Sequence, residues 1–383
     1  MSNKLLKLTI YILNTPLYWV SCCIPKSSNI WIFGTWFGEK YADNSKYLFE
    51  YVNQSHSEIR AIWFSTNKNV IRLLNQKGYE AYFAYSWKGY YFGAKAKFAF
   101  ISASITDINQ YVCSTPRTII VQLWHGTPLK KIHFDDRYNT SLNPSGIKHI
   151  IKSIKELFFP FRGRHFDYTI SSSEIVSNCF HSAFQISKKN LLQTGYPRND
   201  ALFLKKNTKK IILYLPTFRD KSDFNLFQDF SISKMTKILE DNNINFYYKL
   251  HYADKNKPSI KSKRINPVHN IDLYELLSQI DILITDYSSV FFDFLLTDNP
   301  IIFTPFDLDE YIKQDRELYF NYHDVTPGPK CQNWDEVLIE LKNIISGQDE
   351  YCEQRDIINK RFNTFQDGGS SKRVVEYILN HLK

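Results

Sequence analysis

The chain of 383 residues contains no uninterrupted apolar run of about 20 residues, the length that a membrane-spanning helix needs. Its most apolar segment lies at the N-terminus, where Lys7, Asn14 and Pro16 interrupt it. A signal peptide is also disfavoured there, because no clean small-residue cleavage site follows. A spanning or cleaved segment is therefore the least favoured interpretation of these residues.

Cysteine is scarce and unpatterned, with six residues and no CxxC pair. This disfavours a disulfide framework and a zinc site, and it predicts free thiols in a reducing compartment. No compact cluster of His, Cys and carboxylates indicates a metal site. The absence of Walker A, GxGxxG and GxSxG motifs disfavours P-loop hydrolysis, dinucleotide redox chemistry and a nucleophile elbow. We therefore expect that no metal and no cofactor is required.

Charge is the first positive indication, because 48 Lys and Arg against 39 Asp and Glu give a formal net charge of +9. Such an excess favours anionic partners, namely phosphorylated ligands, an anionic bilayer or nucleic acid. The basic residues are scattered and no nucleic-acid-binding motif is present, so we expect no nucleic-acid partner. A hydrophobic content of 43% indicates a globular protein, and the length is natural for two domains.

Residues 1–27 combine an apolar, aromatic stretch with lysines at both ends. The interpretation that we favour is a segment that lies on a membrane surface, with Leu and Trp side chains in the interface and lysines toward lipid phosphates. The alternative is an ordinary first helix that packs on the core.

Short β-rich runs alternate with helical patterns along the chain, which predicts parallel sheets covered by helices on both faces. The pattern restarts after a polar segment near residue 200. We therefore predict an α/β protein with two facing Rossmann-like lobes, residues 28–200 and 201–350, then C-terminal helices over 351–383, and a ligand cleft at the strand ends. The expected strands are 29–34, 59–65, 80–85, 96–102, 118–124, 166–171, 190–195, 209–218, 245–251, 281–286 and 300–306.

The segment VQLWHGTPLKKI places a histidine at the end of a buried strand. His125 lies where open α/β sheets bind ligands, and a histidine there can take a proton from a hydroxyl. Gly126 lets the backbone approach a substrate, Pro128 fixes the turn, and two lysines add positive charge. The alternative is a histidine that is simply hydrogen-bonded into a turn.

Three further segments suit a phosphorylated ligand. His251 ends a strand in the second lobe, although a structural role is equally consistent with its position. Ser288 and Ser289 begin a helix, whose free N–H groups can bind phosphate, with Asp293 one turn further in; the alternative is that Ser288 only caps this helix. Arg219 follows a Pro-Thr turn and suits bidentate phosphate contact, or else forms an ion pair with a nearby acid.

The motifs WHGTPLKKI, TGYPRND, LPTFRD, KLH, ITDYSSVFFD, FDLDEY and PGP occur in an order that resembles the CDP-glycerol glycerophosphotransferase family, over residues 29–375. This family comprises wall teichoic acid primases and polymerases and related capsule polymerases. The resemblance implies a glycosyltransferase-B (GT-B) architecture. It also implies transfer of glycerol phosphate from CDP-glycerol to a hydroxyl of a lipid-linked saccharide or polymer, with release of CMP, by a peripheral enzyme on the cytoplasmic face of the membrane.

The resemblance also implies roles for particular residues. The family's two essential histidines match His125 and His251, although KLHYAD lacks the family's usual proline after the histidine. We expect His125 to be the general base, and the two histidines could exchange roles. The residues that match the family's donor-binding positions are His125, Gly126, Thr127, Pro128, Leu129, Arg219, Ser288, Ser289 and Asp293.

Three alternatives stay open at this point. A GT-B glycosyltransferase that uses a sugar nucleotide has the same fold, and a ribitolphosphotransferase that uses CDP-ribitol differs from the expected enzyme by two carbons of the donor. A non-catalytic scaffold in envelope assembly is the third, and the presence of both histidines argues against it. The sequence also leaves open whether one glycerol phosphate is transferred or many.

Overall fold

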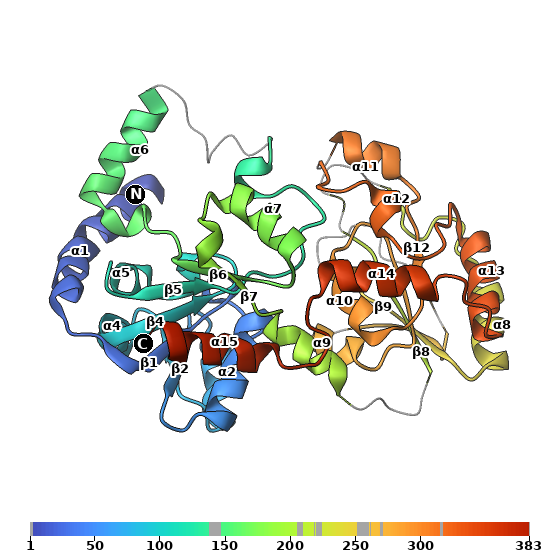
Figure 1. Cartoon of the computed structure of the whole chain (residues 1–383), viewed down its shortest axis with the longest axis horizontal. Coiled ribbons are helices and arrows are strands. Elements are labelled where there is room, and N and C mark those ends of the chain that lie inside the picture. Colours follow the sequence, from blue (N-terminus) through green and yellow to red (C-terminus); the bar gives the residue numbers. More distant parts are fainter. Residues whose placement is uncertain are drawn as a thin grey trace.

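The computed structural model describes residues 3–137, 147–204, 210–217, 219, 224–250, 260, 262–268, 271–314 and 317–382. Within these residues the chain forms two lobes, which lie side by side in Figure 1. Each lobe contains one sheet, and the strands in both sheets pair in parallel. This confirms the predicted α/β class with two Rossmann-like lobes.

The first lobe contains a seven-stranded sheet. Its strands are β1 (Ser27–Phe33), β2 (Arg60–Ser65), β3 (Ala81–Phe83), β4 (Ala96–Ile101), β5 (Ile119–Gln122), β6 (Tyr168–Ser171) and β7 (Leu191–Gln193), and its helices include α2 (Asp43–Ser55), α3 (Lys68–Gln76), α4 (Trp87–Lys95), α5 (Gln110–Cys113) and α7 (Glu174–Phe184). The strand order is β3-β2-β1-β4-β5-β6-β7, so the order reverses between β1 and β4. Helices cover both faces, which is why the strands are apolar on both sides.

The second lobe repeats this plan with five strands. Its strands are β8 (Ile211–Leu215), β9 (Asn245–Tyr248), β10 (Ile265–Pro267), β11 (Ile282–Thr285) and β12 (Ile301–Phe303), and its helices are α8 (Ile232–Asp241), α9 (Leu273–Leu277), α10 (Val290–Phe294), α11 (Leu308–Gln314), α12 (Tyr322–Val325) and α13 (Trp334–Ile345). The order β10-β9-β8-β11-β12 reverses between β8 and β11. α8 and α13 share one apolar core with the sheet, and α9 and α10 belong to another core that also contains residues of the first lobe.

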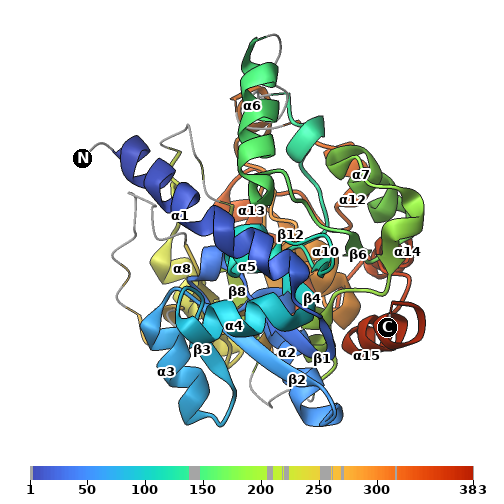
Figure 2. The ribbon, with the colours of Figure 1, turned by 90° about the vertical axis from the view of Figure 1, so that its left-hand side faces the viewer.

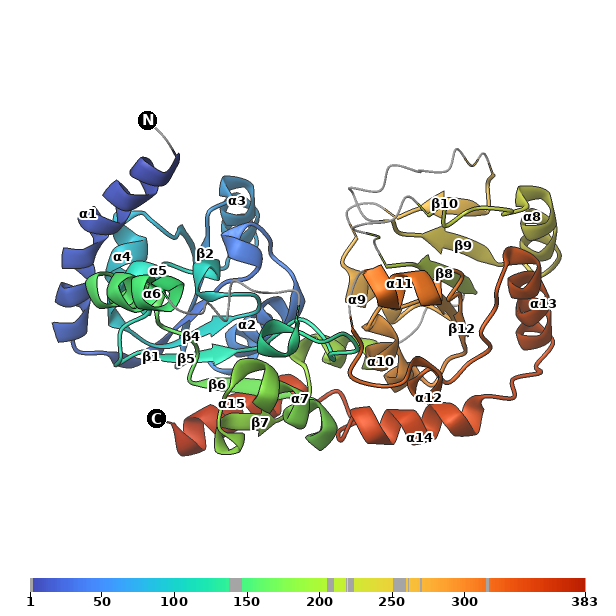
Figure 3. The same ribbon diagram turned by 90° about the horizontal axis from the view of Figure 1, so that it is seen from above.

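Two segments connect the lobes. The short helix η6 (Pro197–Phe203) lies between the two sheets in the sequence and contains the boundary that we predicted near residue 200. Helix α14 (Cys352–Phe362) packs on the second lobe, and α15 (Ser370–His381) returns to the first, where Val374, Val375 and Ile378 join its core. Figure 3 shows α14 and α15 running along the same side of both lobes.

The N-terminal residues form α1 (Asn3–Cys23), on the outside of the first lobe. Its inward face packs on the lobe, because Tyr11 and Tyr18 are buried against Tyr111 and Phe161. Helix α6 (Ile147–Phe158) projects beside α1 in Figure 2. A search of the described residues for a helix that is both long and apolar enough to cross a bilayer finds none. The alternative of a packed first helix therefore holds for the inward face of α1.

Candidate active site between the lobes

The candidate site is a cavity of about 310 Å³ whose wall comes from both lobes. Residues 124–130 and 132, which follow β5, line it from the first lobe. Thr217 and residues 287–289 line it from the second lobe. They follow β8 and β11, the two strands at which the second sheet reverses its order. The cavity therefore lies at the carboxyl ends of strands, at a position where open α/β sheets bind ligands.

The ring of His125 is fixed by contacts from three segments. Its Nδ1 lies 2.9 Å from the carbonyl oxygen of Ser102, which follows β4. Because a carbonyl can only accept a hydrogen bond, Nδ1 carries the proton and Nε2 is the unprotonated nitrogen of the neutral ring. The ring also stacks on Trp124 with centroids 4.0 Å apart, and Trp36 lies 5.2 Å away. His125 therefore presents a proton acceptor of defined orientation at the cavity wall.

The electrostatic surroundings of His125 favour the neutral ring. Burial lowers its pKa below the ordinary value of 6.5, and the cation of Arg198 acts in the same direction. The carboxylate of Asp43 opposes this shift and raises the pKa. A neutral imidazole near pH 7 is the form that a general base requires.

Gly126 brings the backbone of the first lobe against the second. Its φ of +148° is a conformation that residues with side chains rarely adopt, and a Cβ there would lie 3.1 Å from Ser289 Oγ. The next residues are also tied to the second lobe, since the amide of Tyr319 donates to the carbonyl of Leu129 at 2.9 Å. The amide of Lys131 donates to the carbonyl of Glu317 at 2.8 Å. The loop after β5 is thus held by both lobes.

The opposite wall of the cavity carries hydroxyl groups. Ser288 and Ser289 line it just before α10, and Ser289, at the N-cap position, makes no side-chain capping bond. Thr217 Oγ1 is buried on the same wall and has no hydrogen-bond partner among the described residues. Hydroxyl groups of this kind can donate to phosphate oxygens. The structure thus places both serines opposite His125, and their contact with the donor stays a prediction.

Arg219 forms buried ion pairs with two carboxylates of the second lobe. Its side chain is 3% exposed and lies between two carboxylates. Nη1 donates to Asp286 Oδ2 at 2.8 Å, and Nε and Nη2 donate to the two oxygens of Asp307 at 2.7 Å each. Nη1 also donates to the carbonyl of Thr217. In this structure Arg219 holds the loops after β8, β11 and β12 together, and its contact with the donor stays a prediction.

Asp293 is not among the residues that line the cavity. Its side chain is fully buried and accepts hydrogen bonds from Arg198, Asn199 and Tyr274 at 2.6–3.1 Å. A carboxylate in direct contact with a phosphate would be repelled, whereas here its charge is balanced by Arg198. Asp293 therefore forms an ion pair at the junction of the lobes, and its expected contact with the donor stays a prediction.

The remaining predicted residues divide into two groups. Thr127, Pro128 and Leu129 line the cavity as the motif suggested. His251 lies outside the described residues, so its role stays a prediction. No group of three or more His, Cys, Asp and Glu side chains suited to a metal ion is found in the described part of the chain.

Several wall residues were not singled out from the sequence as ligand contacts. They are Trp124, Ile132, Thr217 and Tyr287, together with Lys130, whose cationic charge alone had been noted. Lys130 Nζ lies 5.0 Å over the ring of Tyr311. The sequence offered one indication that most of these residues line the cavity, namely that they are next to the predicted His-Gly-Thr-Pro and Ser-Ser motifs.

Two Rossmann-like lobes with a ligand cavity between their strand ends define a GT-B type enzyme. The solved structure of the wall teichoic acid polymerase TagF matches the whole chain, with 100% of both chains covered, a TM-score of 0.76 and 25% sequence identity. A putative UDP-N-acetylglucosamine 2-epimerase from Listeria monocytogenes shares the fold alone, with a TM-score of 0.55 and 12% identity.

Residues 17–380 match the family described as CDP-Glycerol:Poly(glycerophosphate) glycerophosphotransferase. The chain therefore belongs to this family. It is 30% identical to the teichoic acid glycerol-phosphate transferase of Staphylococcus aureus, over 92% of this chain and 93% of that protein. It is 27% identical to the teichoic acid poly(glycerol phosphate) polymerase of Bacillus subtilis, over 99% of this chain but 52% of the polymerase. The chain thus spans about half the length of that polymerase.

Proposed function

We propose that the chain transfers glycerol phosphate from CDP-glycerol to a hydroxyl of a lipid-linked saccharide or polyol-phosphate polymer and releases CMP, with His125 as general base. The observation that supports this role best is the Nδ1–H of His125 bonded to Ser102, which leaves Nε2 as an acceptor at the cavity wall. Family membership supports the donor, and the relatives' names support a teichoic acid acceptor; the lipid link of the acceptor is part of the proposal. No metal or further cofactor is part of the proposal.

The proposed reaction is a displacement at the β-phosphorus of the donor. The acceptor oxygen forms a bond to this phosphorus, the bond to the CMP oxygen breaks, and the hydroxyl proton passes to Nε2 of His125. Phosphoryl transfer depends mostly on positioning and on stabilising charge. Ser288, Ser289 and Thr217 would donate to the phosphate oxygens, and Lys130 would add positive charge from the first-lobe wall.

The pH dependence of activity tests the base directly. Because the pKa of His125 is lowered, its neutral form persists below pH 6.5, and activity is lost only when the pH falls through this lowered pKa. We therefore expect kcat/KM for CDP-glycerol, which reports the free enzyme, to have an acid limb with its midpoint below 6.5. The measurement is kcat/KM against pH, and an acid limb centred above 6.5 would contradict the assignment.

The outward faces of α1 and α6 form a candidate membrane-contacting surface, which we call the α1–α6 surface (Figure 2). Clustered apolar exposure of this kind marks an interaction site, and lysines on the same helices suit an anionic bilayer. Such contact would hold the enzyme peripherally on the cytoplasmic face, near a lipid-linked acceptor. Its exposed apolar residues are Leu5, Leu6, Leu8, Ile10, Ile12, Leu13, Leu17, Trp19, Val20, Ile150, Ile151, Ile154, Leu157 and Phe158.

Point substitutions test this surface better than a deletion of residues 1–27, which would also remove Tyr11 and Tyr18 from their buried positions. We expect the double variant Ile12→Asp/Leu157→Asp to bind anionic vesicles at least about 10-fold less tightly. Each apolar side chain contributes about 1.5–3 kcal/mol when buried, and each new carboxylate is repelled by anionic lipid. Vesicle co-sedimentation measures the effect.

The matched control is Ile357→Asp on α14, because Ile357 is 57% exposed and Ile12 is 56% exposed. This control should sediment with vesicles like the unmodified protein, and both variants should keep its thermal stability. Unchanged binding of the double variant, or an equal loss in the control, would refute membrane contact through the α1–α6 surface.

A further inference from the structure

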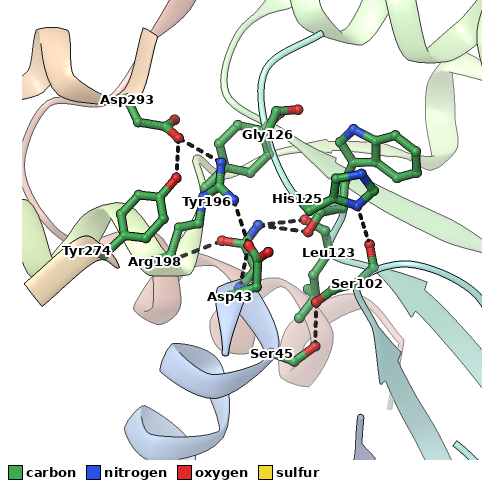
Figure 4. A network of polar contacts seen from close by, with 12 residues as sticks. Asp43, Ser45, Ser102, Leu123, His125, Gly126, Tyr196, Arg198, Tyr274 and Asp293 are labelled. Atoms are coloured by element: carbon green, nitrogen blue, oxygen red, sulfur yellow. Dashed lines mark hydrogen bonds and ion pairs between the residues drawn. The ribbon is translucent and has the colours of Figure 1, made fainter. Parts of the chain in front are cut away.

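A buried group of charges joins the two lobes behind the wall of the cavity (Figure 4). Arg198 lies on η6 and is 4% exposed. Its Nη1 donates at 2.6 Å to Oδ1 of Asp43, which belongs to α2 of the first lobe. Its Nη2 donates at 2.7 Å to Oδ2 of Asp293, which belongs to α10 of the second lobe. One guanidinium therefore bridges a carboxylate of each lobe.

The same bridge is connected to the backbone that precedes His125. The amide of Arg198 donates to Asn44 Oδ1 at 3.1 Å. Asn44 Nδ2 in turn donates to the carbonyls of Leu123 and Trp124, at 2.9 and 3.0 Å. These carbonyls belong to the two residues directly before His125. A displacement of Arg198 would therefore be transmitted to the loop through a single side chain.

The bridge also lies against His125 and Gly126 themselves. Asp43 Oδ2 accepts a hydrogen bond from Trp36 Nε1 at 3.2 Å, and the ring of Trp36 lies 5.2 Å from that of His125. A Cβ on Gly126 would lie 3.2 Å from Arg198 Nη2. Asp43 has a φ of +63°, a conformation that costs energy for a residue other than glycine and persists only where surrounding contacts enforce it.

We propose that Arg198 is a positioning residue of the transfer reaction, which holds Asp43 and Asp293 together and thereby fixes the His125 loop relative to the donor-binding wall at Ser289. The inference rests on the proposed role of His125 as base. The base belongs to the first lobe and the serine wall to the second, so their separation depends on contacts between the lobes. Arg198 makes ion pairs with both sides of that junction.

The first test is Arg198→Lys, which keeps the positive charge but replaces the planar fork with a single ammonium group that cannot hold both carboxylates in the same geometry. We expect kcat to fall about 10- to 100-fold, since a misplacement of about 1 Å can cost 10²-fold. The KM for CDP-glycerol should change less than about threefold, because Arg198 does not line the cavity.

The chain offers a matched control in Arg355 on α14. Arg355 is 2% exposed and forms a comparable forked ion pair with Asp349, at 2.9 and 2.5 Å, away from the cavity. Arg355→Lys should destabilise the fold to a similar extent and keep the kcat of the unmodified enzyme. If Arg198→Lys does not fold, Asp293→Asn replaces it, and the same loss of kcat is expected.

The second test follows the titration of His125 by NMR in the ligand-free protein and needs no activity. The charged or titratable groups near its ring are Asp43 on α2, Arg198 on η6 and His133, which belongs to the short helix η3 (His133–Asp135). Since Asp43 raises the pKa of His125, Asp43→Asn should shift the titration to lower pH. Arg355→Lys should leave it unchanged.

The outcomes separate this inference from the proposed function. An unmodified enzyme that transfers nothing from CDP-glycerol would refute the proposed function, and the NMR titration would still test the link between the bridge and His125. The positioning role is overturned if a folded Arg198→Lys keeps kcat within about twofold, if Arg355→Lys loses as much, or if Asp43→Asn leaves the titration of His125 unchanged.

Discussion

Replacing His125 by alanine is expected to reduce the turnover of CDP-glycerol by about 10²–10⁴-fold, the usual contribution of a general base. The variant removes the one nitrogen at the cavity wall that the hydrogen bond to Ser102 leaves available as an acceptor. The affinity for CDP-glycerol should change much less, because the proposed phosphate contacts come from the opposite wall. CMP release at saturating donor measures the first effect, and calorimetry with CDP-glycerol measures the second.

His165→Ala is the control for this variant. His165 is an exposed histidine of the first lobe, and it is not among the residues that line the cavity. Its turnover should stay within about twofold of the unmodified enzyme. Near-normal turnover in a folded His125→Ala variant, under conditions in which chemistry limits the rate, would remove His125 from the role of base.

Replacing Arg219 by alanine is expected to lower the free energy of unfolding by about 3–5 kcal/mol, because two buried carboxylates lose the cation between them. Asp286 and Asp307 are 0% and 3% exposed, so water cannot replace the lost partner without rearrangement. Three loops of the second lobe would then be released together. Urea unfolding of the purified variant measures the change in stability.

Lys234→Ala provides the comparison, because Lys234 pairs with Asp335 on the surface, with 59% and 65% of the two side chains exposed. A surface pair contributes about 0–1 kcal/mol, so this variant should unfold nearly as the unmodified protein does. Should Arg219→Ala keep its stability but lose affinity for CDP-glycerol, the arginine would face the donor, as the sequence had suggested.

The strands were predictable because both faces of the sheets are buried and each strand is an apolar run. Each of the eleven expected strands overlaps an observed one, and these are β1 to β9, β11 and β12. β10 was not predicted, since it is three residues long and ends in Pro267. α6 was not predicted either, although Ile150, Ile154 and Leu157 recur at helical spacing.

The position of the site was predictable to a greater extent than the partners of its charged residues. A histidine after a strand of the first sheet and two serines after a strand of the second were expected at the carboxyl ends of those strands, and they line one cavity between the lobes. The buried ion pairs were not predictable, because their partners are far apart in the sequence. Arg219 and Asp307 are 88 residues apart, and Arg198 and Asp43 are 155 residues apart. Such partners depend on how the loops and lobes pack, which no local pattern in the chain specifies.

The central claim is tested most directly by mass analysis of the product from a synthetic lipid-linked disaccharide. The purified protein is incubated with this acceptor and CDP-glycerol, and parallel samples contain CDP-ribitol or a UDP-sugar. We predict that the acceptor gains glycerol phosphate units, that one CMP is released for each unit added, and that the other donors react far more slowly. Transfer of a sugar from the UDP-sugar, or no CMP release from either CDP-polyol, would contradict the account.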